Sequence, residues 1–367
     1  MANLAATILG DMVATTPAFD KNEELTGLYG GLAAFMKQTK DPLGIVTPEL
    51  VTMAAASSGR TLKVPVINKN TTALVGSTRA VDLIGYQNTS AFQSVAFSPY
   101  TYEIEMIRAY NDTNYISYER DFRRKVEEME NKIIAALDLA ACTVLSTNKT
   151  QYLIEKLGNA FAANIYSITA QQKESLFSDL KTLMTFNKFN GMIDIVANAG
   201  VKQLYDKLAQ SGLNNAENKQ MQYNGLNFNF SNNVANALGK GGSGYAIEAG
   251  TLGMLTRVEY DARMGNRATN GREFSVVTLP KTGIQCALYS YSEPQDKSLI
   301  QSNLERPIVE KYGFAFDAAL FSAYNSAPTT IPTPIVKFDM AIGDTSTLVT
   351  VVNTATNPVY VNEVVAS

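Results

Sequence analysis

One uninterrupted helical pattern, from about Ser117 to Thr147, constrains the fold of this chain more than any other feature. Apolar residues recur there at steps of three and four, and neither proline nor glycine interrupts them. At about 1.5 Å per residue, such a helix spans roughly 45 Å. Its first half carries charge pairs such as Arg124 with Glu128, whereas Ile133–Cys142 is apolar nearly all round. We therefore expect one end to lie in a core and the other to extend along a surface.

The chain before this helix consists of two segments with different sequence patterns. Residues 1–49 contain glycine, alanine and one helical candidate near Glu23–Lys37, which predicts a moderately mobile N-terminal arm. From Arg60 to about Arg108 the pattern is that of strands and turns, and it predicts a long β excursion. An isolated ribbon of this kind is only marginally stable in water. We expect it to lie against something else, most economically a neighbouring subunit.

The chain after the long helix alternates between helical and extended patterns. We expect a second helix over Thr169–Phe186, a buried strand over Ile193–Ala197 and a further helix over Val201–Ala209. Strands and loops follow, and a breaker-rich stretch at Ala327–Pro334 precedes a short β-rich tail that reaches Ser367. The tail is too short to form a core of its own, so it must pair with the body of the protein or with a neighbour.

The composition excludes several classes of function. The chain has no histidine, which removes His-based triads, the usual zinc sites and His-based proton relays. Its 31 Lys and Arg nearly balance its 34 Asp and Glu, for a net charge of −3, and this disfavours a basic nucleic-acid reader. Cys142 and Cys286 lie far apart in apolar runs and are expected to be reduced, buried thiols. No run approaches the roughly 18 apolar residues of a membrane span, and the first residues lack a signal-peptide pattern.

Two local motifs have a structural interpretation that outweighs the chemical one. Gly239–Gly244 matches a dinucleotide-binding pattern, but a strand rather than a helix follows it, so we interpret it as a flexible surface loop. Cys142 has no histidine to activate it and no basic neighbours in the sequence. We therefore interpret it as a structural thiol rather than a nucleophile.

Two charged groups indicate contact surfaces rather than ligand sites. Glu103 and Glu105 share one strand face at roughly 7 Å, a separation that glycosidase carboxylates use. Without tryptophan to bind a sugar, they fit better as a solvated face that meets basic residues. A mixed-sign cluster likewise predicts salt-bridged loops at a contact surface; it comprises Arg257, Arg263, Arg267 and Arg272 with Glu259, Asp261 and Glu273.

The order of these elements resembles the major capsid protein of tailed bacteriophages, which has the Hong Kong 97 fold. The resemblance rests on the arm, a ribbon entered through Lys63–Val66, the long helix, the Thr169–Phe186 helix and Ile193–Asn198 before the next helix. It implies an α+β chain with an N-arm, an extended β E-loop, a spine helix, a P-domain sheet and an A-domain. The expected ranges are 1–49 for the N-terminal arm, 50–112 for the E-loop, 113–190 for the P-domain with its spine helix at 117–147, 191–304 for the A-domain, 305–334 for a return to the P-domain and 335–367 for a C-terminal β extension.

The resemblance implies a structural protein rather than an enzyme. Such a subunit assembles with itself as pentamers and hexamers into an icosahedral shell around packaged double-stranded DNA, which it contacts non-specifically. The implied location is the virion, after assembly in the host bacterial cytoplasm, with separate scaffold, portal and decoration proteins and with no cofactor, metal or membrane. An arm and a ribbon that cannot bury themselves fit obligate assembly on physical grounds as well.

The same interpretation predicts where the chain meets its neighbours and where its core lies. The candidate contacts form an electrostatic seam, within or between subunits, that pairs strand and helix carboxylates with basic residues of the ribbon and helix. The apolar half of the long helix should be enclosed by the P-domain sheet and the Thr169–Phe186 helix. The contact candidates are Arg60, Lys63, Lys69, Arg79, Glu103, Glu105, Arg123, Arg124, Glu127, Glu128, Arg263 and Arg267.

Two alternatives remain open from the sequence. An encapsulin-type nanocompartment shell shares the implied fold but holds protein cargo, and nuclease-protected DNA in purified particles would separate the two. An α/β enzyme without His-based chemistry would use Asp194 or Glu248 as an acid or base. That enzyme needs a convergent pocket, which no spacing in the sequence indicates.

Overall fold

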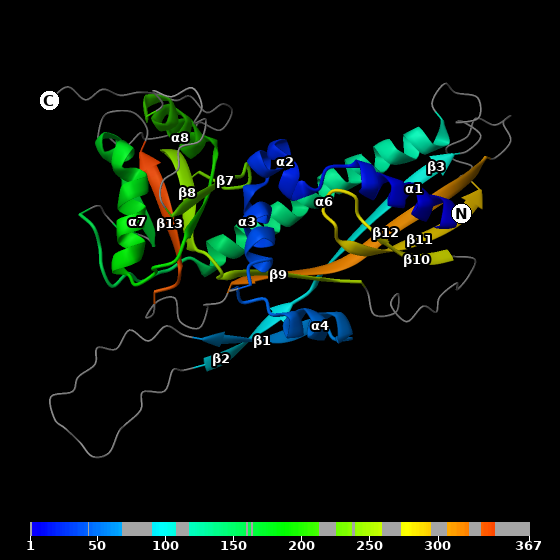
Figure 1. Ribbon diagram of the computed structural model, residues 1–367, viewed down its shortest axis with the longest axis horizontal. Helices are drawn as coiled ribbons and strands as arrows, with labels where there is room; N and C mark the ends of the chain where they lie inside the picture. The colour runs from blue at the N-terminus through cyan, green and yellow to red at the C-terminus, as the bar shows by residue number, and fades with distance from the viewer. Residues whose placement is uncertain are drawn as a thin grey trace, which may run out of the picture.

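The structure is a computed structural model that describes residues 2–42, 44–67, 90–107, 117–158, 161–162, 164–212, 225–236, 239–258, 273–294, 307–322 and 332–341. Helices and strands both contribute heavily, which confirms the predicted α+β class. Figure 1 shows two sheets at opposite ends of the long helix α6, with a small ribbon below them.

The long helix α6 (Tyr118–Asn148) confirms the predicted element to within a residue at each end. It begins after Ser117, whose hydroxyl accepts a hydrogen bond from the backbone N–H of Arg120. Phe122, Val126 and Met129 of the first half are completely buried, like Ile134 and Leu137 of the second. The expectation that only one end of the helix lies in a core is therefore wrong. The helix therefore links the two sheets through one continuous apolar stripe.

The first sheet has five strands and packs against the N-terminal half of α6. Its order is β10–β11–β12–β3, and β9 pairs with the C-terminal part of β12. In β3 the predicted solvated face is confirmed, because Glu103 and Glu105 are exposed and alternate with the buried Ile104 and Met106. The strands are β3 (Ser98–Ile107), β9 (Leu252–Arg257), β10 (Glu273–Thr278), β11 (Gln285–Pro294) and β12 (Ile308–Ser322).

The second sheet has six strands in the order β4–β5–β13–β8–β6–β7. Strand β6 is completely buried, as its apolar sequence predicts. The strands are β4 (Phe161–Ala162), β5 (Ile165–Ile168), β6 (Ile193–Ala197), β7 (Leu226–Phe230), β8 (Lys240–Glu248) and β13 (Ile335–Ala341). Around them lie the 3-10 helix η2 (Ala170–Ser175), α7 (Leu176–Phe186) and α8 (Ala199–Gly212).

The predicted packing of α7 is wrong. Its buried residues, among them Phe177, Leu180 and Met184, belong to a core formed with the six-stranded sheet and α8. The apolar half of α6 instead packs with the N-terminal helices and with both sheets. The amphipathic pattern of α7 shows that the helix covers an apolar surface, but two such surfaces were available, and the pattern does not select between them.

The glycine-rich motif is also not the surface loop that the sequence indicated. Lys240–Glu248 is strand β8 in the middle of the six-stranded sheet. A Cβ atom on Gly200 would lie 1.8 Å from the carbonyl oxygen of Gly241, and one on Gly244 would lie 2.5 Å from the Phe338 ring. The glycines therefore serve close packing of α8 and β13 on β8.

The N-terminal residues form packed helices rather than a loose arm. Helix α1 places Ile8, Leu9 and Met12 in the core between β10 and α6. Their spacing is that of one helix face, which the interpretation as an arm overlooked. The elements are α1 (Ala2–Thr15), the 3-10 helix η1 (Phe19–Lys21), α2 (Glu23–Leu28), α3 (Gly30–Thr39) and α4 (Pro48–Ala56).

The single helix expected near Glu23–Lys37 is divided into α2 and α3 at Tyr29. A Cβ atom on Gly30 would lie 2.4 Å from the backbone nitrogen of Phe230, so only glycine permits this contact with β7.

The sheets divide the chain differently from the predicted ranges. Strands β9, β10 and β11 fall in the expected A-domain range 191–304, yet they pair in the five-stranded sheet with β12 and β3. Strand β13 begins at 335, where an extension was expected, but lies between β5 and β8. Residues 335–341 are therefore part of the sheet rather than of an extension.

Candidate assembly surfaces

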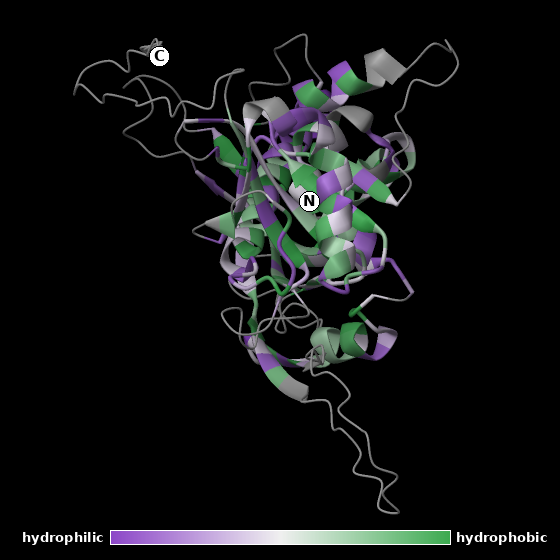
Figure 2. Ribbon diagram, turned by 90° about the vertical axis from the view of Figure 1, so that its left-hand side faces the viewer, coloured by the Kyte–Doolittle hydropathy of each residue, from purple (hydrophilic) through white to green (hydrophobic). Residues whose placement is uncertain are grey.

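The predicted β excursion is present as an antiparallel ribbon of β1 (Thr61–Ile67) and β2 (Ser90–Ala96). One ribbon face is buried inside the chain, where Leu62, Val64 and Val95 pack with Leu50 and Ala54 of α4. Figures 1 and 2 show the ribbon and α4 at the lower edge of the described chain, where they pack on β9 and β12 through Leu255, Ala319 and Phe321. The chain thus covers one ribbon face with its own helix, which removes part of the need for a neighbour.

The other ribbon face is exposed. Thr61, Lys63 and Pro65 lie directly opposite Ala96, Ser94 and Phe92 and alternate with the buried residues. Phe92 is 75% exposed, the largest exposure among the large hydrophobic residues of the described chain. A two-stranded ribbon with an uncovered aromatic residue is a surface suited to a partner.

Arg257 anchors the base of this ribbon. Its guanidinium lies 3.1 Å from Asp317 Oδ2 of β12 and donates hydrogen bonds to the carbonyl oxygens of Ser57 and Gly59 at 2.9 and 2.7 Å. It also stacks over the Phe97 ring, at 4.2 Å from the ring centroid. The expectation of a contact-surface loop is therefore wrong for Arg257, whose side chain is buried.

The carboxylates of β3 meet a lysine of their own sheet. Lys311 Nζ lies 2.6 Å from Glu293, 3.0 Å from Glu105 and 3.6 Å from Glu103. The hydrogen bonds to Glu293 and Glu105 raise the pKa of Lys311. This outer sheet face thus carries three carboxylates around one ammonium group, and the basic residue that meets Glu103 and Glu105 is Lys311, which was not among the contact candidates.

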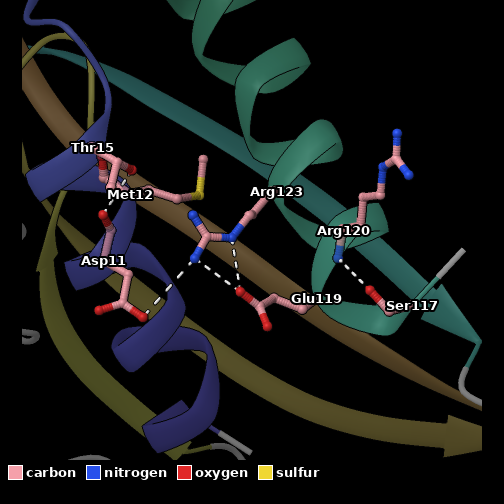
Figure 3. A network of polar contacts seen from close by, with 7 residues as sticks. All are labelled: Asp11, Met12, Thr15, Ser117, Glu119, Arg120 and Arg123. Atoms are coloured by element: carbon pink, nitrogen blue, oxygen red, sulfur yellow. Dashed lines mark hydrogen bonds and ion pairs between the residues drawn. The ribbon is translucent and has the colours of Figure 1, made fainter.

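The charged half of α6 pairs mainly within itself. Arg123 lies 2.9 Å from Glu119 and 3.9 Å from Asp11 of α1, as Figure 3 shows, and Arg124 lies 3.4 Å from Glu128. These contacts confirm the i,i+4 pairs and show that Arg123 also meets the N-terminal helix.

The links between α6 and β3 come from other lysines of the helix. Lys125 Nζ donates to the carbonyl oxygen of Glu105 at 2.8 Å, and Lys132 Nζ lies 2.8 Å from the Tyr102 hydroxyl. Glu127 is exposed. The candidates Lys69, Arg79, Arg263 and Arg267, together with Arg272, lie outside the described residues.

Two buried carboxylates that the sequence analysis did not single out hold the N-terminal helices and a turn. Asp138 of α6 accepts hydrogen bonds from the backbone N–H of Leu32 at 2.8 Å, from the Ser231 hydroxyl at 2.6 Å and from the Asn233 amide at 2.7 Å. Glu130 accepts from the backbone N–H groups of Lys281 and Thr282, each at 2.7 Å. The sequence could have indicated both residues, because each is a charged residue on the apolar stripe of the predicted long helix.

Asp194 also acts as a structural connector. One oxygen accepts from the Gln38 side chain at 2.5 Å and the other from Asn227 at 2.9 Å. Gln38 in turn accepts from the backbone N–H groups of Thr251 and Leu252. Asp194, a candidate acid or base for an enzyme, therefore joins α3 to both sheets. Glu248, the other candidate, is the last residue of β8 and donates its backbone N–H to the Pro334 carbonyl oxygen.

Glu130 predicts a measurable pH dependence of stability. Burial raises its pKa above the ordinary 4.5, and Oε2 has no hydrogen-bond partner among the described residues. Its charged neighbour Lys281 lowers that pKa, and the nearby Cys286 is a buried thiol. Because the folded pKa is raised, the stabilising contribution is fully present below about pH 4.5 and is lost as the pH rises through the folded value.

We therefore expect Glu130→Gln to remove this dependence, since glutamine keeps the Oε1 acceptor without a charge. Urea denaturation at pH 5 and pH 8 measures the effect. The wild-type chain should lose stability relative to the variant as the pH rises. A difference that stays constant with pH would contradict the assignment.

Both cysteines are free and buried, as the sequence predicts. Burial raises the pKa of Cys142 and of Cys286 to about 12, so neither is an activated thiolate. In the described ranges, no cluster of three or more Cys, Asp or Glu residues is arranged to hold a metal ion. No helix of the described chain is long and apolar enough to span a membrane.

No family model matches this chain, and no curated protein matches it. Many solved structures match this chain, among them the following three. The alignment with the capsid structure of the cyanophage P-SCSP1u covers 79% of this chain and 86% of the cyanophage chain, at 12% identity and a TM-score of 0.42. The alignment with a structure from Mycobacterium phage Adephagia covers 80% of this chain and 90% of the phage chain, at 12% identity and a TM-score of 0.44. The alignment with the capsid of a native GTA particle covers 78% of this chain and 86% of the GTA chain, at 8% identity and a TM-score of 0.41.

Proposed function

We propose that this chain is the major capsid protein of a tailed bacteriophage, a structural subunit that assembles into an icosahedral shell as pentamers and hexamers. The observation that carries the proposal is the exposed ribbon face, where Phe92 is 75% exposed beside Pro65. Burying a phenylalanine stabilises a contact by about 1.5–3 kcal/mol, and a second copy of the chain supplies that burial in a shell.

The architecture supports the same proposal. A ribbon at one edge of the five-stranded sheet precedes a long helix, and that helix connects this sheet to the six-stranded sheet. In the proposed subunit the ribbon is the E-loop and α6 is the spine helix. An enzyme would need a convergent catalytic pocket, whereas Asp194 is bound to Gln38 and Asn227 in the interior.

The charge distribution also suits a shell that encloses DNA. A net charge of −3, from 31 basic and 34 acidic residues, allows copies to pack together without strong repulsion. The lumen then contacts double-stranded DNA without reading its sequence. We place the protein in the virion, after assembly in the host bacterial cytoplasm, with separate scaffold, portal and decoration proteins. The contact candidates on the ribbon and on the charged half of α6 are the proposed seam between copies.

Phe92→Glu tests the proposal. We expect the variant to fold, because Phe92 makes little contact inside the chain, but to assemble only at a concentration at least tenfold higher than the wild type. Phe186→Glu is the matched control, since Phe186 is also exposed, at 58%, but lies on α7 away from the ribbon. Sedimentation and negative-stain images measure the particles, and circular dichroism checks the fold.

Two outcomes would contradict the proposal. The first is a wild-type chain that remains a stable monomer at all salt and protein concentrations. The second is a Phe92→Glu variant that forms shells as readily as the wild type. Nuclease-protected DNA inside purified particles would distinguish a genome container from a shell with protein cargo.

A further inference from the structure

A groove opens on the six-stranded end of the molecule, between η2 and α8. Its volume is about 690 Å³, and residues from η2, the start of α8, β8 and the end of β13 line it. Its floor includes Leu204 and Met340, which are almost completely buried, together with the backbone of Gly200 and Gly241. The groove thus has an apolar floor made by small and aliphatic residues.

The rim of the groove is basic. Lys173, Lys202 and Lys207 line it with a single carboxylate, that of Asp206. Lys202 and Lys207 are exposed, and the ion pair of Lys207 with Glu174 is long, at 3.9 Å, and exposed on both sides. An exposed pair of this kind is worth at most about 1 kcal/mol, so it does not prevent Lys207 from meeting another carboxylate.

The last described residue of β13 lies in the wall of this groove. Ala341 is one of the lining residues, and residues 342–367 follow it in the chain. That segment contains neither lysine nor arginine, and its charged side chains are Asp344 and Glu363. Its aliphatic residues are Ile342, Leu348, Val349, Val351, Val352, Val359, Val361, Val364 and Val365.

We propose that the groove binds residues 342–367 of the same chain. The aliphatic side chains match the apolar floor, and the carboxylates match the lysine rim. A segment that starts in the wall of the groove reaches it at a high effective concentration, so modest contacts suffice. This inference does not depend on shell assembly, because it concerns one chain.

Zero-length cross-linking of the full chain tests the proposal directly. A carbodiimide joins a lysine Nζ to a carboxyl group only when the two are in contact. The reaction is carried out on a mixture of ¹⁴N- and ¹⁵N-labelled chains. We expect amide links from Lys173, Lys202 or Lys207 to Asp344 or Glu363, and the two peptides joined by each link should carry the same label. Absence of these links overturns the proposal. Links with mixed labels also overturn it, because they show that the segment binds a second copy.

Hydrogen exchange provides an independent test. The double variant Lys202→Glu with Lys207→Glu reverses two rim charges, and we expect amides in residues 342–367 to exchange roughly tenfold faster than in the wild type. Lys156→Glu with Lys181→Glu is the matched control, since both lysines are exposed and neither lines the groove. The buried amides of β6 report whether each variant is folded. Equal exchange in the groove variant and the wild type overturns the proposal.

Discussion

Leu137→Ala should lower the free energy of unfolding by about 2–5 kcal/mol and yield insoluble or degraded subunits. Leu137 lies in the apolar half of α6, is completely buried and belongs to the largest core of the chain. That core contains side chains from the N-terminal helices and from both sheets. Removing the Leu137 side chain therefore leaves a cavity where several elements meet rather than at a single contact.

Leu139→Ala is the matched control for this substitution. Leu139 lies two residues further along the same helix but is 56% exposed, so the change should cost less than about 0.5 kcal/mol. Urea denaturation of both variants at equal protein concentration measures the difference. Soluble, native-like Leu137→Ala subunits that fail only in assembly would place the apolar half of α6 at an interface instead.

Arg257→Leu should lower by about 3–5 kcal/mol the free energy that holds the base of the ribbon to the five-stranded sheet. The substitution leaves Asp317, which is largely buried, without its ion pair and removes the donor to the carbonyl oxygens of Ser57 and Gly59. These three groups belong to β12 and to the segment between α4 and β1. The loss should therefore loosen the ribbon from the five-stranded sheet before the rest of the chain unfolds.

Limited proteolysis of the folded protein measures this loosening, as faster cleavage in the segment between α4 and β1. Arg124→Leu is the control, because Arg124 forms an exposed i,i+4 pair with Glu128 that is worth at most about 0.5 kcal/mol. If the two variants are cleaved at the same rate, Arg257 does not anchor the ribbon.

Several elements could be predicted because their evidence lies in adjacent residues. The repeat of apolar residues in α6, the alternation in β3 and the apolar run of β6 each define an element and its buried face. The ribbon itself was predicted in the same way, from the extended pattern of residues 60–108, but its exposed Phe92 was not among the contact candidates. What the sequence did not show is that α4 covers that face.

Other features could not be predicted because they depend on residues that are far apart in the chain. The glycines at 241 and 244 resemble a loop until β8, α8 and β13 are placed together. The helix at 176–186 could cover either sheet. The pairing of Lys311 with Glu103 and Glu105 requires β12 to lie beside β3 in one specific register.

By itself, the sequence determined the long helix, the ribbon and the buried strand β6, and it excluded His-based chemistry. Local periodicity sets helix or strand, and a chain without histidine has no side chain that ordinarily titrates near neutral pH. Only the tertiary structure decided which buried carboxylates connect the elements, as Asp138 does with Leu32, 106 residues away. The physical reason is that a buried charge is tolerated only where donors converge on it, and these donors come from segments that meet only in the folded chain.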